Sequence, residues 1–506
     1  MASSFIKTEH DLQIYLNETE KKLEKLGNRL GELNFKRFID KKNNPEIIEL
    51  SKERSELMLD PDLHSHIAKW QGHVKDPTLA RRVDVWSDTL LLARVEAKPE
   101  IVELQQQIAY TVMSHGYKVG DKRLSLGEIR SIIRANPNKK EREEAWRSHT
   151  ELNNLVADDM LRLFSLRNEA AKQLGYNTYV DLRLEKNGML TRQRVEDLLK
   201  ELTEATQSYY EDLIEEGAQK LGINTIDPWD IQYILEQQGG VPKQYFPKDK
   251  LNTSLEEWCN HMGFSMSDYG IEPVFIDIPY NGLTMGLSRN NIKILANPDD
   301  GFTYYGTHFH ELGHALHGAL KTVDAYILNR ESSIYNEGMA EVFGYITHDL
   351  EWLKKFHNLS DDIAKQALRS SIGPKYHYIR QRTAYCLFEY EAYKDLDQDM
   401  NELMAKTEAN ILHCTYDPTP RWASNGWYVS YPVYWQNYVI ADFIASQIHH
   451  HLNEHIGSLT TAKEAFDYVV KNYIEQGALV PWLEKVKKGT NKNLNADAII
   501  ADLTNI

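Results

Sequence analysis

A long leucine periodicity near the start of the chain constrains its fold more than any other feature. Between residues 12 and 33 an apolar side chain recurs at alternating spacings of four and three, with glutamate and lysine between. The positions are Leu12, Leu16, Thr19, Leu23, Leu26, Leu30 and Leu33. This period places one mainly leucine stripe along an α-helix. We expect the stripe to pack within this chain, although a coiled-coil partner is an alternative.

The same helical period continues through much of the sequence. We expect further helices within residues 100–115, 141–172, 192–222 and 362–412. The chain has 506 residues, only 16 prolines and no Gly/Ser-rich or Pro-rich linker between autonomous domains. The predicted fold is therefore mostly α, a large multi-helix body in one continuous unit. We divide it into an N-terminal helical lobe, residues 1–265, and a second lobe, residues 266–506.

One segment departs from the helical pattern. Residues 271–298 contain short β-branched runs separated by turn signals at Tyr280-Asn281-Gly282 and Asn290-Asn291. We therefore expect a small antiparallel sheet here. It directly precedes the residues that indicate chemistry.

Charge and cysteine content exclude several classes of protein. Acidic residues outnumber basic ones by 74 to 58, which gives a net charge of −16 and argues against nucleic acid as a partner. Cys259, Cys386 and Cys414 have no disulfide or metal-binding spacing, which favours a reducing compartment. The sequence shows neither a signal peptide nor the roughly 20 apolar residues that span a membrane. We predict a cytoplasmic monomer or weak dimer that binds no membrane.

A metal-binding motif lies directly after the predicted sheet. His310-Glu311-Leu312-Gly313-His314 has the pattern H-E-x-x-H. Residues four apart share one helix face, so both imidazoles can bind a single cation. Glu311 would reach a water bound there without being a ligand. Zinc suits this arrangement, because catalytic zinc accepts imidazole and carboxylate and keeps one position open.

A pair of glutamates downstream supplies candidates for the third ligand. Glu337 and Glu341, in the run NEGMAEVF, are four residues apart and share a face of a second helix. We assign Glu337 as the ligand. Glu341 would accept a hydrogen bond from the other nitrogen of a metal-bound histidine. The reverse assignment stays open, and Glu331 is a weaker third candidate. The prediction is one Zn²⁺ per chain.

These residues resemble a known family. THFHELGHALHG, the NEGMAEVF helix and the preceding IKILANPDD strand resemble the thimet oligopeptidase and oligoendopeptidase F family of zinc peptidases. RNEAAKQLGYNTYVDLRLEKNGML, residues 167–190, is similar to a helical segment that precedes the catalytic half in that family. The angiotensin-converting enzyme family is the second resemblance. The resemblance implies a helical body with a deep channel that has zinc at its floor and the small sheet beside the site.

The implied activity is hydrolysis of internal bonds in short unstructured peptides. Zinc lowers the pKa of its bound water from about 15.7 towards 7, and Glu311 serves as general base and then general acid. By similarity Tyr431, or else Tyr434, donates to the developing oxyanion. Tyr428 would contact the C-terminal side of the peptide. Family members often have a histidine before these tyrosines, but here none occurs between His413 and His449.

Two further expectations concern the substrate. The missing histidine leaves the second carbonyl-binding group open, with Asn425 as a guess. The strand at residues 292–297, including Ile294 and Ala296, would pair with an extended peptide if it lies at a sheet edge. The alternative is ordinary internal sheet structure.

Two other functions remain as alternatives. One is a peptidyl-dipeptidase that cuts at the carboxy end, as in the angiotensin-converting enzyme family. It needs a group that binds the terminal carboxylate, and the candidates are Lys375, Arg380, Arg421 and Tyr428. The other is a non-enzymatic helical scaffold that binds peptides. A structural zinc would usually have four protein ligands, whereas the sequence offers three.

Overall fold

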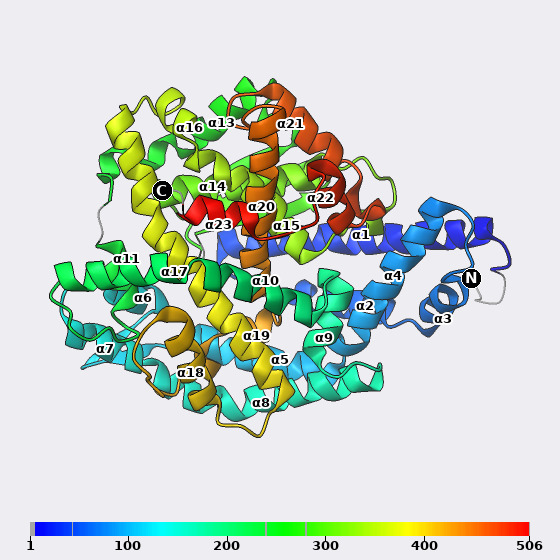
Figure 1. Cartoon of the computed structure of the whole chain (residues 1–506). Coiled ribbons are helices and arrows are strands. Elements are labelled where there is room, and N and C mark those ends of the chain that lie inside the picture. Colours follow the sequence, from blue (N-terminus) through cyan, green and yellow to red (C-terminus); the bar gives the residue numbers. More distant parts are fainter. Residues whose placement is uncertain (1–5, 43, 238–239, 279–280, 505–506) are drawn as a thin grey trace. The chain divides into compact units, whose positions relative to one another are not determined.

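The computed structural model describes residues 6–42, 44–237, 240–278 and 281–504. Helices dominate it (Figure 1), which confirms the predicted mostly α fold class. The chain forms two compact units. Unit 1 comprises Met1–Ala97, Pro242–Ala364 and Ala441–Asn495, and unit 2 comprises Lys98–Val241, Lys365–Ile440 and Ala496–Ile506. The predicted lobes at 1–265 and 266–506 divide the sequence differently and stay a prediction.

Unit 1 contains ten described α-helices and three strands that lie wholly within it, together with the π-helix η9 (Val470–Ile474). The α-helices and strands are α1 (Glu9–Asp40), α2 (Pro45–Met58), α3 (Pro61–Trp70), α4 (Pro77–Glu96), α13 (Leu251–His261), β3 (Ile271–Phe275), β4 (Gly282–Ser288), β5 (Asn291–Ala296), α14 (Phe302–Ala319), α15 (Ser333–Gly344), α16 (Leu350–Lys355), α21 (Lys463–Val469) and α22 (Trp482–Thr490). Between α14 and α15 a short 3₁₀ turn, η6 (Tyr326–Asn329), shapes the connection.

Unit 2 is helical apart from one short hairpin. Its elements are α5 (Pro99–Ser114), β1 (Tyr117–Val119), β2 (Lys122–Leu124), α6 (Leu126–Ala135), α7 (Lys139–Arg147), α8 (His149–Gln173), α9 (Tyr179–Arg183), the π-helix η2 (Leu184–Gly188), α10 (Arg192–Ala205), α11 (Gln207–Lys220), α12 (Ile231–Glu236), α18 (Met400–Leu412), α19 (Trp427–Ser430) and α23 (Asp497–Thr504). Two helices, α17 (Asp361–Lys394) and α20 (Trp435–His455), have residues in both units.

The leucine stripe is buried along α1. Every stripe position from Leu12 to Leu33 is inaccessible or nearly so, and the first half packs on apolar residues of α3 and α4. A capping box between Thr8 and Asp11 begins the helix. Glu20 is also buried, where it accepts from Arg82 Nε at 2.6 Å and Trp86 Nε1 at 2.9 Å. The stripe therefore packs within the chain, and α1 is part of the core of unit 1.

The sheet of unit 1 has three strands in the order β3–β5–β4. β4 and β5 form the expected antiparallel pair, with Leu283 opposite Leu295. β3 joins them in parallel with β5, so that Ile271 lies opposite Ile292. Residue 280 of the predicted first turn lies outside the described residues. The sheet packs against α14, since β4 and β5 both contact that helix.

An aromatic core supports the two helices α14 and α15. Trp258 of α13 makes edge contacts with Phe309 of α14 and Phe343 of α15, at centroid distances of 6.1 and 5.8 Å. Trp352 of α16 also makes an edge contact with Phe309, at 5.5 Å. Edge-to-face aromatic pairs at such distances are favourable and restrict rotation of the rings. The core therefore fixes the position of the helix that carries the H-E-x-x-H motif.

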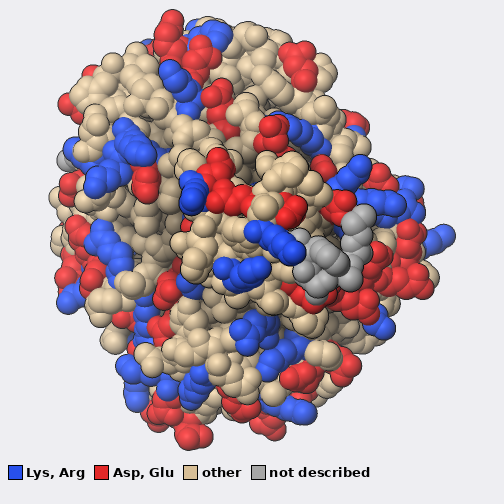
Figure 2. Space-filling view, turned by 90° about the vertical axis from the view of Figure 1, so that its right-hand side faces the viewer, with Lys and Arg blue, Asp and Glu red and all other residues tan. Residues whose placement is uncertain are grey.

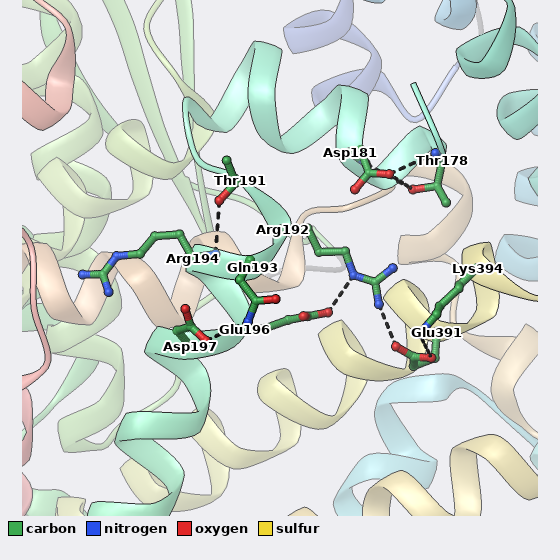
Figure 3. Close-up of polar contacts among 10 residues, drawn as sticks. All are labelled: Thr178, Asp181, Thr191, Arg192, Gln193, Arg194, Glu196, Asp197, Glu391 and Lys394. Atoms are coloured by element: carbon green, nitrogen blue, oxygen red, sulfur yellow. Dashed lines mark hydrogen bonds and ion pairs between the residues drawn. The ribbon is translucent and has the colours of Figure 1, made fainter. Parts of the chain in front are cut away.

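Ionic contacts fasten α10 to α17 in unit 2. Arg192, the first residue of α10, donates to Glu196 Oε1 and to Glu391 Oε1 of α17, both at 2.6 Å (Figure 3). Thr191 caps the helix by accepting from Arg194 N. Deeper in the unit, Asn168 of α8 donates to the carbonyl of Tyr393 at 2.7 Å. These contacts fix the C-terminal part of α17.

The surface carries charges of both signs. On the face shown in Figure 2, lysine and arginine side chains are interspersed with aspartate and glutamate. Every helix in the described part of the chain is too short or too polar to span a lipid bilayer.

Candidate metal centre

Three potential metal ligands meet between α14 and α15. His310 Nε2 lies 3.4 Å from Glu337 Oε2, and His314 Nε2 lies 3.7 Å from the same oxygen. The ligand atoms of the three residues all lie within 4.8 Å of one another. Within the described residues, these are the three side chains whose geometry could hold a metal ion.

The two helices approach each other closely at a glycine of the motif. A Cβ on Gly313 would lie 2.7 Å from both Cα and O of Ala340. Real side chains do not tolerate this distance, so the backbones of α14 and α15 meet only because Gly313 has no side chain. The motif thereby brings its histidines to Glu337 on the neighbouring helix.

This donor set fits a catalytic zinc ion. Tetrahedral ligands at about 2.0–2.1 Å from one zinc lie roughly 3.4 Å apart. The distances from Glu337 Oε2 to His310 and His314, 3.4 and 3.7 Å, are close to that separation. Two imidazoles and one carboxylate also leave a fourth position for water, as in catalytic centres.

Glu341 lies one turn beyond Glu337 and contacts the other nitrogen of His310. The distance between Glu341 Oε2 and His310 Nδ1 is 3.0 Å. Burial acts to lower the pKa of His310, but hydrogen bonds with Glu337 and Glu341 outweigh it and raise the pKa well above its usual value. Burial acts to raise the pKa of Glu337, yet its hydrogen bonds with His310 and His314 lower it overall. A cation that binds here displaces the proton of His310.

Strand β4 fixes the carboxylate of Glu311. Thr284 Oγ1 lies 2.7 Å from Glu311 Oε2 and 2.8 Å from the carbonyl oxygen of Glu311. The hydroxyl has one proton, and the ionised carboxylate is the stronger acceptor. A Cβ on Gly282 would lie 2.7 Å from Cγ of Glu311, so glycine is required for this approach. No pattern in the sequence indicates Thr284 or Gly282 as site residues, because their role depends on how β4 lies against α14.

We expect Thr284→Val to lower turnover by about 10-fold or more, since a hydrogen bond to a charged group contributes about 1.5–3 kcal/mol. The metal content should stay unchanged, because Thr284 contacts Glu311 and no proposed ligand. Thr284→Ser keeps the hydroxyl and should retain most of the activity. Peptide hydrolysis and bound metal measured on the three proteins check this, and equal rates for Val and Ser would contradict it.

Two other histidines of the motif region point elsewhere. His308 is buried and pairs with Asn252 Oδ1 at 2.9 Å. His317 is buried 2.7 Å from Glu331 Oε2, and Glu331 also pairs with Lys321 and Lys485, at 3.1 and 2.6 Å. Burial acts to raise the pKa of Glu331, but Lys321 and His317 lower it well below its usual value. The structure therefore places Glu331, the weaker ligand candidate, in a separate buried ionic cluster.

We expect Glu331→Gln to lower the free energy of unfolding by about 3–5 kcal/mol, because Lys321 and Lys485 then stay buried without their counter-charge. A carboxyl whose pKa is lowered by folding stabilises the native state above its unfolded pKa, and this contribution disappears as the pH falls. The wild type should therefore lose more stability in acid than the variant. Thermal unfolding at neutral and acid pH measures both effects. The control, Glu272→Gln, removes an exposed partner of Lys293 and should change stability by less than about 0.5 kcal/mol.

The predicted tyrosines belong to unit 2. Tyr431 is 45% exposed and packs on Trp427 and Tyr434, at centroid distances of 4.8 and 5.7 Å. Tyr434 is half-buried. Tyr428 is 0% exposed, and its hydroxyl donates to the carbonyl of Tyr385 at 3.3 Å. This burial does not support the predicted peptide contact of Tyr428, whose helical spacing reflects core packing instead.

The turn between Tyr431 and Tyr434 has an unusual backbone. Val433 has φ of +53°, in the left-handed region, where a β-branched side chain is strongly disfavoured. Such a residue costs about 1–3 kcal/mol and persists only when its surroundings enforce it. Asn425, the guessed carbonyl-binding residue, accepts from Trp427 N at 3.2 Å and thus helps to begin α19.

The predicted peptide-binding strand is the middle strand of its sheet. β5 pairs with β3 on one side and β4 on the other, and Ile294 and Ala296 are 0% and 2% exposed. Its backbone groups already serve both neighbours, so the expectation of a free edge was wrong. The parallel strand β3 pairs with the side of β5 that does not face β4. The sequence pattern did not distinguish this parallel strand from an antiparallel one. In the described sheet, β4 pairs with β5 alone, and β4 is the strand that contacts Glu311.

Part of the chain is similar in sequence to a known peptidase family. Residues 132–261 match the sequence model of peptidase family M3. The chain is a zinc metallopeptidase with a segment similar to family M3. This confirms the resemblance to the thimet oligopeptidase and oligoendopeptidase F family, and the non-enzymatic scaffold is excluded. The match includes residues 167–190, quoted above for the resemblance, and ends before the H-E-x-x-H motif of the metallopeptidase.

A solved structure shares the fold of this metallopeptidase. The M32 carboxypeptidase from Deinococcus radiodurans R1 superposes with a TM-score of 0.69 over 98% of each chain, at 12% sequence identity. At this identity the likeness shows the fold. No curated protein sequence matches the metallopeptidase. The second resemblance, to the angiotensin-converting enzyme family, stays a prediction.

Proposed function

We propose that this metallopeptidase is a zinc-dependent oligopeptidase that hydrolyses internal bonds of short unstructured peptides. His310, His314 and Glu337 would bind one Zn²⁺ per chain. The observation that carries the proposal is the convergence of these three ligands beside the carboxylate of Glu311. The M3 match supports the oligopeptidase assignment.

The chemistry of the site assigns a role to each side chain. Bound zinc would supply a Lewis acid that lowers the pKa of water and polarises the scissile carbonyl. Glu311, oriented by Thr284, accepts the proton of the attacking water and transfers it to the leaving amine. Glu341 fixes the orientation of the His310 ring through Nδ1. A hydroxyl of Tyr431 or Tyr434 donates to the oxyanion.

Peptide binding by backbone pairing is assigned to β4 instead of β5. An extended peptide that adds to a sheet gains affinity from main-chain hydrogen bonds and tolerates many sequences. Gly282 and Thr284 lie on β4 next to Glu311, so a peptide paired there would have a backbone carbonyl close to the general base.

The second candidate function is carboxypeptidase-like cleavage at the carboxy end. The observation that favours it is the fold shared with an M32 carboxypeptidase. All four predicted carboxylate-binding groups make internal contacts, and Lys375 Nζ lies 5.6 Å from the centre of the Tyr378 ring. Arg380 is 1% exposed and donates to Thr203 O and Ile411 O, Arg421 pairs with Glu408, and Tyr428 is buried. These contacts favour the endopeptidase.

Mass spectrometry of a mixed pool of short peptides distinguishes the two. Each peptide is supplied with a free and with an amidated C-terminus, and the pool is incubated with wild type and Glu311→Gln. We expect internal cuts in both forms by the wild type alone. Loss of cleavage on amidation would establish the carboxy-end activity instead, and no cleavage by the zinc-loaded wild type would contradict the oligopeptidase proposal for that pool.

A further inference from the structure

The turn between Tyr431 and Tyr434 is bonded to buried polar side chains of unit 2. Glu389 of α17 is 0% exposed and accepts from Val433 N at 2.8 Å. Gln436 Nε2 donates to Val433 O at 2.7 Å. The side chain of Val433 is itself 1% exposed. Both peptide groups of the strained residue are thus bonded to side chains instead of to other backbone.

A second buried side chain fixes the beginning of the same segment. Arg167 of α8 is 1% exposed and donates to the carbonyls of Tyr428 and Val429, both at 2.8 Å. It also donates to Tyr393 Oη at 3.2 Å. A guanidinium is planar and can bind two carbonyls at once, which an ammonium group cannot do with the same geometry.

Helix α17, which supplies Glu389, is fixed independently of the turn. Two residues further along, Glu391 pairs with Arg192 (Figure 3). Asn168 binds the carbonyl of Tyr393, and the Tyr393 ring stacks on Phe164 at 4.3 Å. A rigid helix and a buried carboxyl therefore impose the left-handed conformation on Val433.

We infer that Arg167 and Glu389 are positioning residues of the reaction, which hold the Tyr428–Tyr434 segment in the strained conformation that presents Tyr431 and Tyr434. Strained backbone persists where its surroundings enforce it, and it concentrates at functional sites. Here Glu389 bonds the strained residue that lies between Tyr431 and Tyr434, and Arg167 holds the beginning of the same segment. The inference rests on the proposed role of these tyrosines as oxyanion donors.

The chemistry of Glu389 determines which substitutions test this. Burial raises its pKa to about 8, against the lowering effects of Val433 N–H, Arg167 and Arg183. Burial therefore favours the neutral carboxyl at pH 7, and glutamine has nearly the same shape and can accept the same hydrogen bond. Leucine fills a similar volume but leaves the Val433 N–H buried without a partner.

The first measurement is backbone hydrogen exchange of the 427–436 segment by mass spectrometry, on the full-length protein. We expect Glu389→Leu to exchange at least about tenfold faster there, because the turn opens locally. Glu389→Gln should match the wild type. Asp230→Leu is the matched control, since Asp230 is a 0% exposed carboxylate of the same unit that pairs with Arg142. It should leave the segment unchanged. Equal exchange in the leucine and glutamine variants of Glu389 would overturn the inference.

The second measurement is turnover of each variant, alone and in a background in which both Tyr431 and Tyr434 are replaced by phenylalanine. Glu389→Leu should lower kcat by about 10–100-fold with little change in KM, whereas Glu389→Gln should restore the rate. In the Tyr431→Phe, Tyr434→Phe background, Glu389→Leu should have almost no further effect, because its effect passes through the tyrosines. A full further loss in that background would overturn the inference, since the role of Glu389 is then general to the fold.

Arg167→Lys gives an independent variant if Glu389→Leu does not fold. It keeps the charge but loses the two-carbonyl contact, and it should change exchange and kcat in the same direction as Glu389→Leu. If Arg167→Lys has the same hydrogen exchange and kcat as the wild type, Arg167 is not a positioning residue. Faster exchange with unchanged kcat would overturn the positioning role. If the tyrosine variants themselves hydrolyse peptides at the wild-type rate, the oxyanion assignment of the proposed function fails instead.

Discussion

Glu311→Gln should lower the hydrolysis of short peptides by about 10²–10⁴-fold, the usual contribution of a general acid–base group. The amide cannot accept the proton of the attacking water at neutral pH, and it has no proton of the required acidity for the leaving amine. Its shape is nearly that of the carboxylate, and Thr284 can still donate to the amide oxygen. The protein should therefore fold and bind metal as the wild type does.

Metal content and turnover together decide this prediction. The variant should contain as much zinc as the wild type, measured by atomic absorption after purification under equal conditions. The control is Glu257→Gln, the same substitution at an exposed glutamate of α13, and it should keep full activity. Loss of zinc from Glu311→Gln would mean that Glu311 is a ligand, and full turnover would remove it from the chemistry.

The sequence predicted the helices well because each one has its own repeating pattern. The stripe from Leu12 to Leu33 is buried along α1. The segments 141–172, 192–222 and 362–412 are helical, but each is interrupted, for example at Ser148 and Thr206. An interruption of one residue leaves the apolar period intact on both sides, so periodicity cannot detect it. Only backbone geometry shows where one helix ends.

Strand order and burial were harder to predict, because both depend on residues far away in the sequence. The runs at 271–298 indicated strands correctly, but nothing local shows that β3 pairs with β5 in parallel. Likewise Tyr428 and Tyr431 belong to one aromatic-rich run, yet one is buried and the other is 45% exposed. The side chains that distinguish them, Phe164 and Phe388, come from α8 and α17.

The site residues were predictable where one helix fixes their spacing. His310 and His314 share a face through the four-residue period, as do Glu337 and Glu341. The meeting of the two helices depends on Gly313, which the motif itself contains. Thr284 approaches Glu311 from a strand, and no pattern in the sequence relates the two.

Glu337→Gln should weaken zinc binding far more than Glu341→Gln does. An amide oxygen carries no charge and is a poor zinc ligand. The variant therefore offers zinc two neutral imidazoles, whereas the wild type offers a carboxylate as well. Glu341 contacts His310 Nδ1 at 3.0 Å. A side chain that orients a metal ligand in this way typically contributes about 10–100-fold to metal affinity. We expect Glu337→Gln to exceed that range.

Competition with a chelator measures both affinities under the same conditions. The two variants are a matched pair, since each makes the same exchange on the same helix, one turn apart. Their order is decided by geometry: Glu337 Oε2 lies 3.4 and 3.7 Å from the Nε2 atoms of the two histidines, whereas Glu341 contacts only the opposite side of His310. A larger loss in Glu341→Gln would reverse the two roles. Equal and small losses would mean that neither glutamate binds the metal, because a cation left with two neutral imidazoles could not keep its affinity.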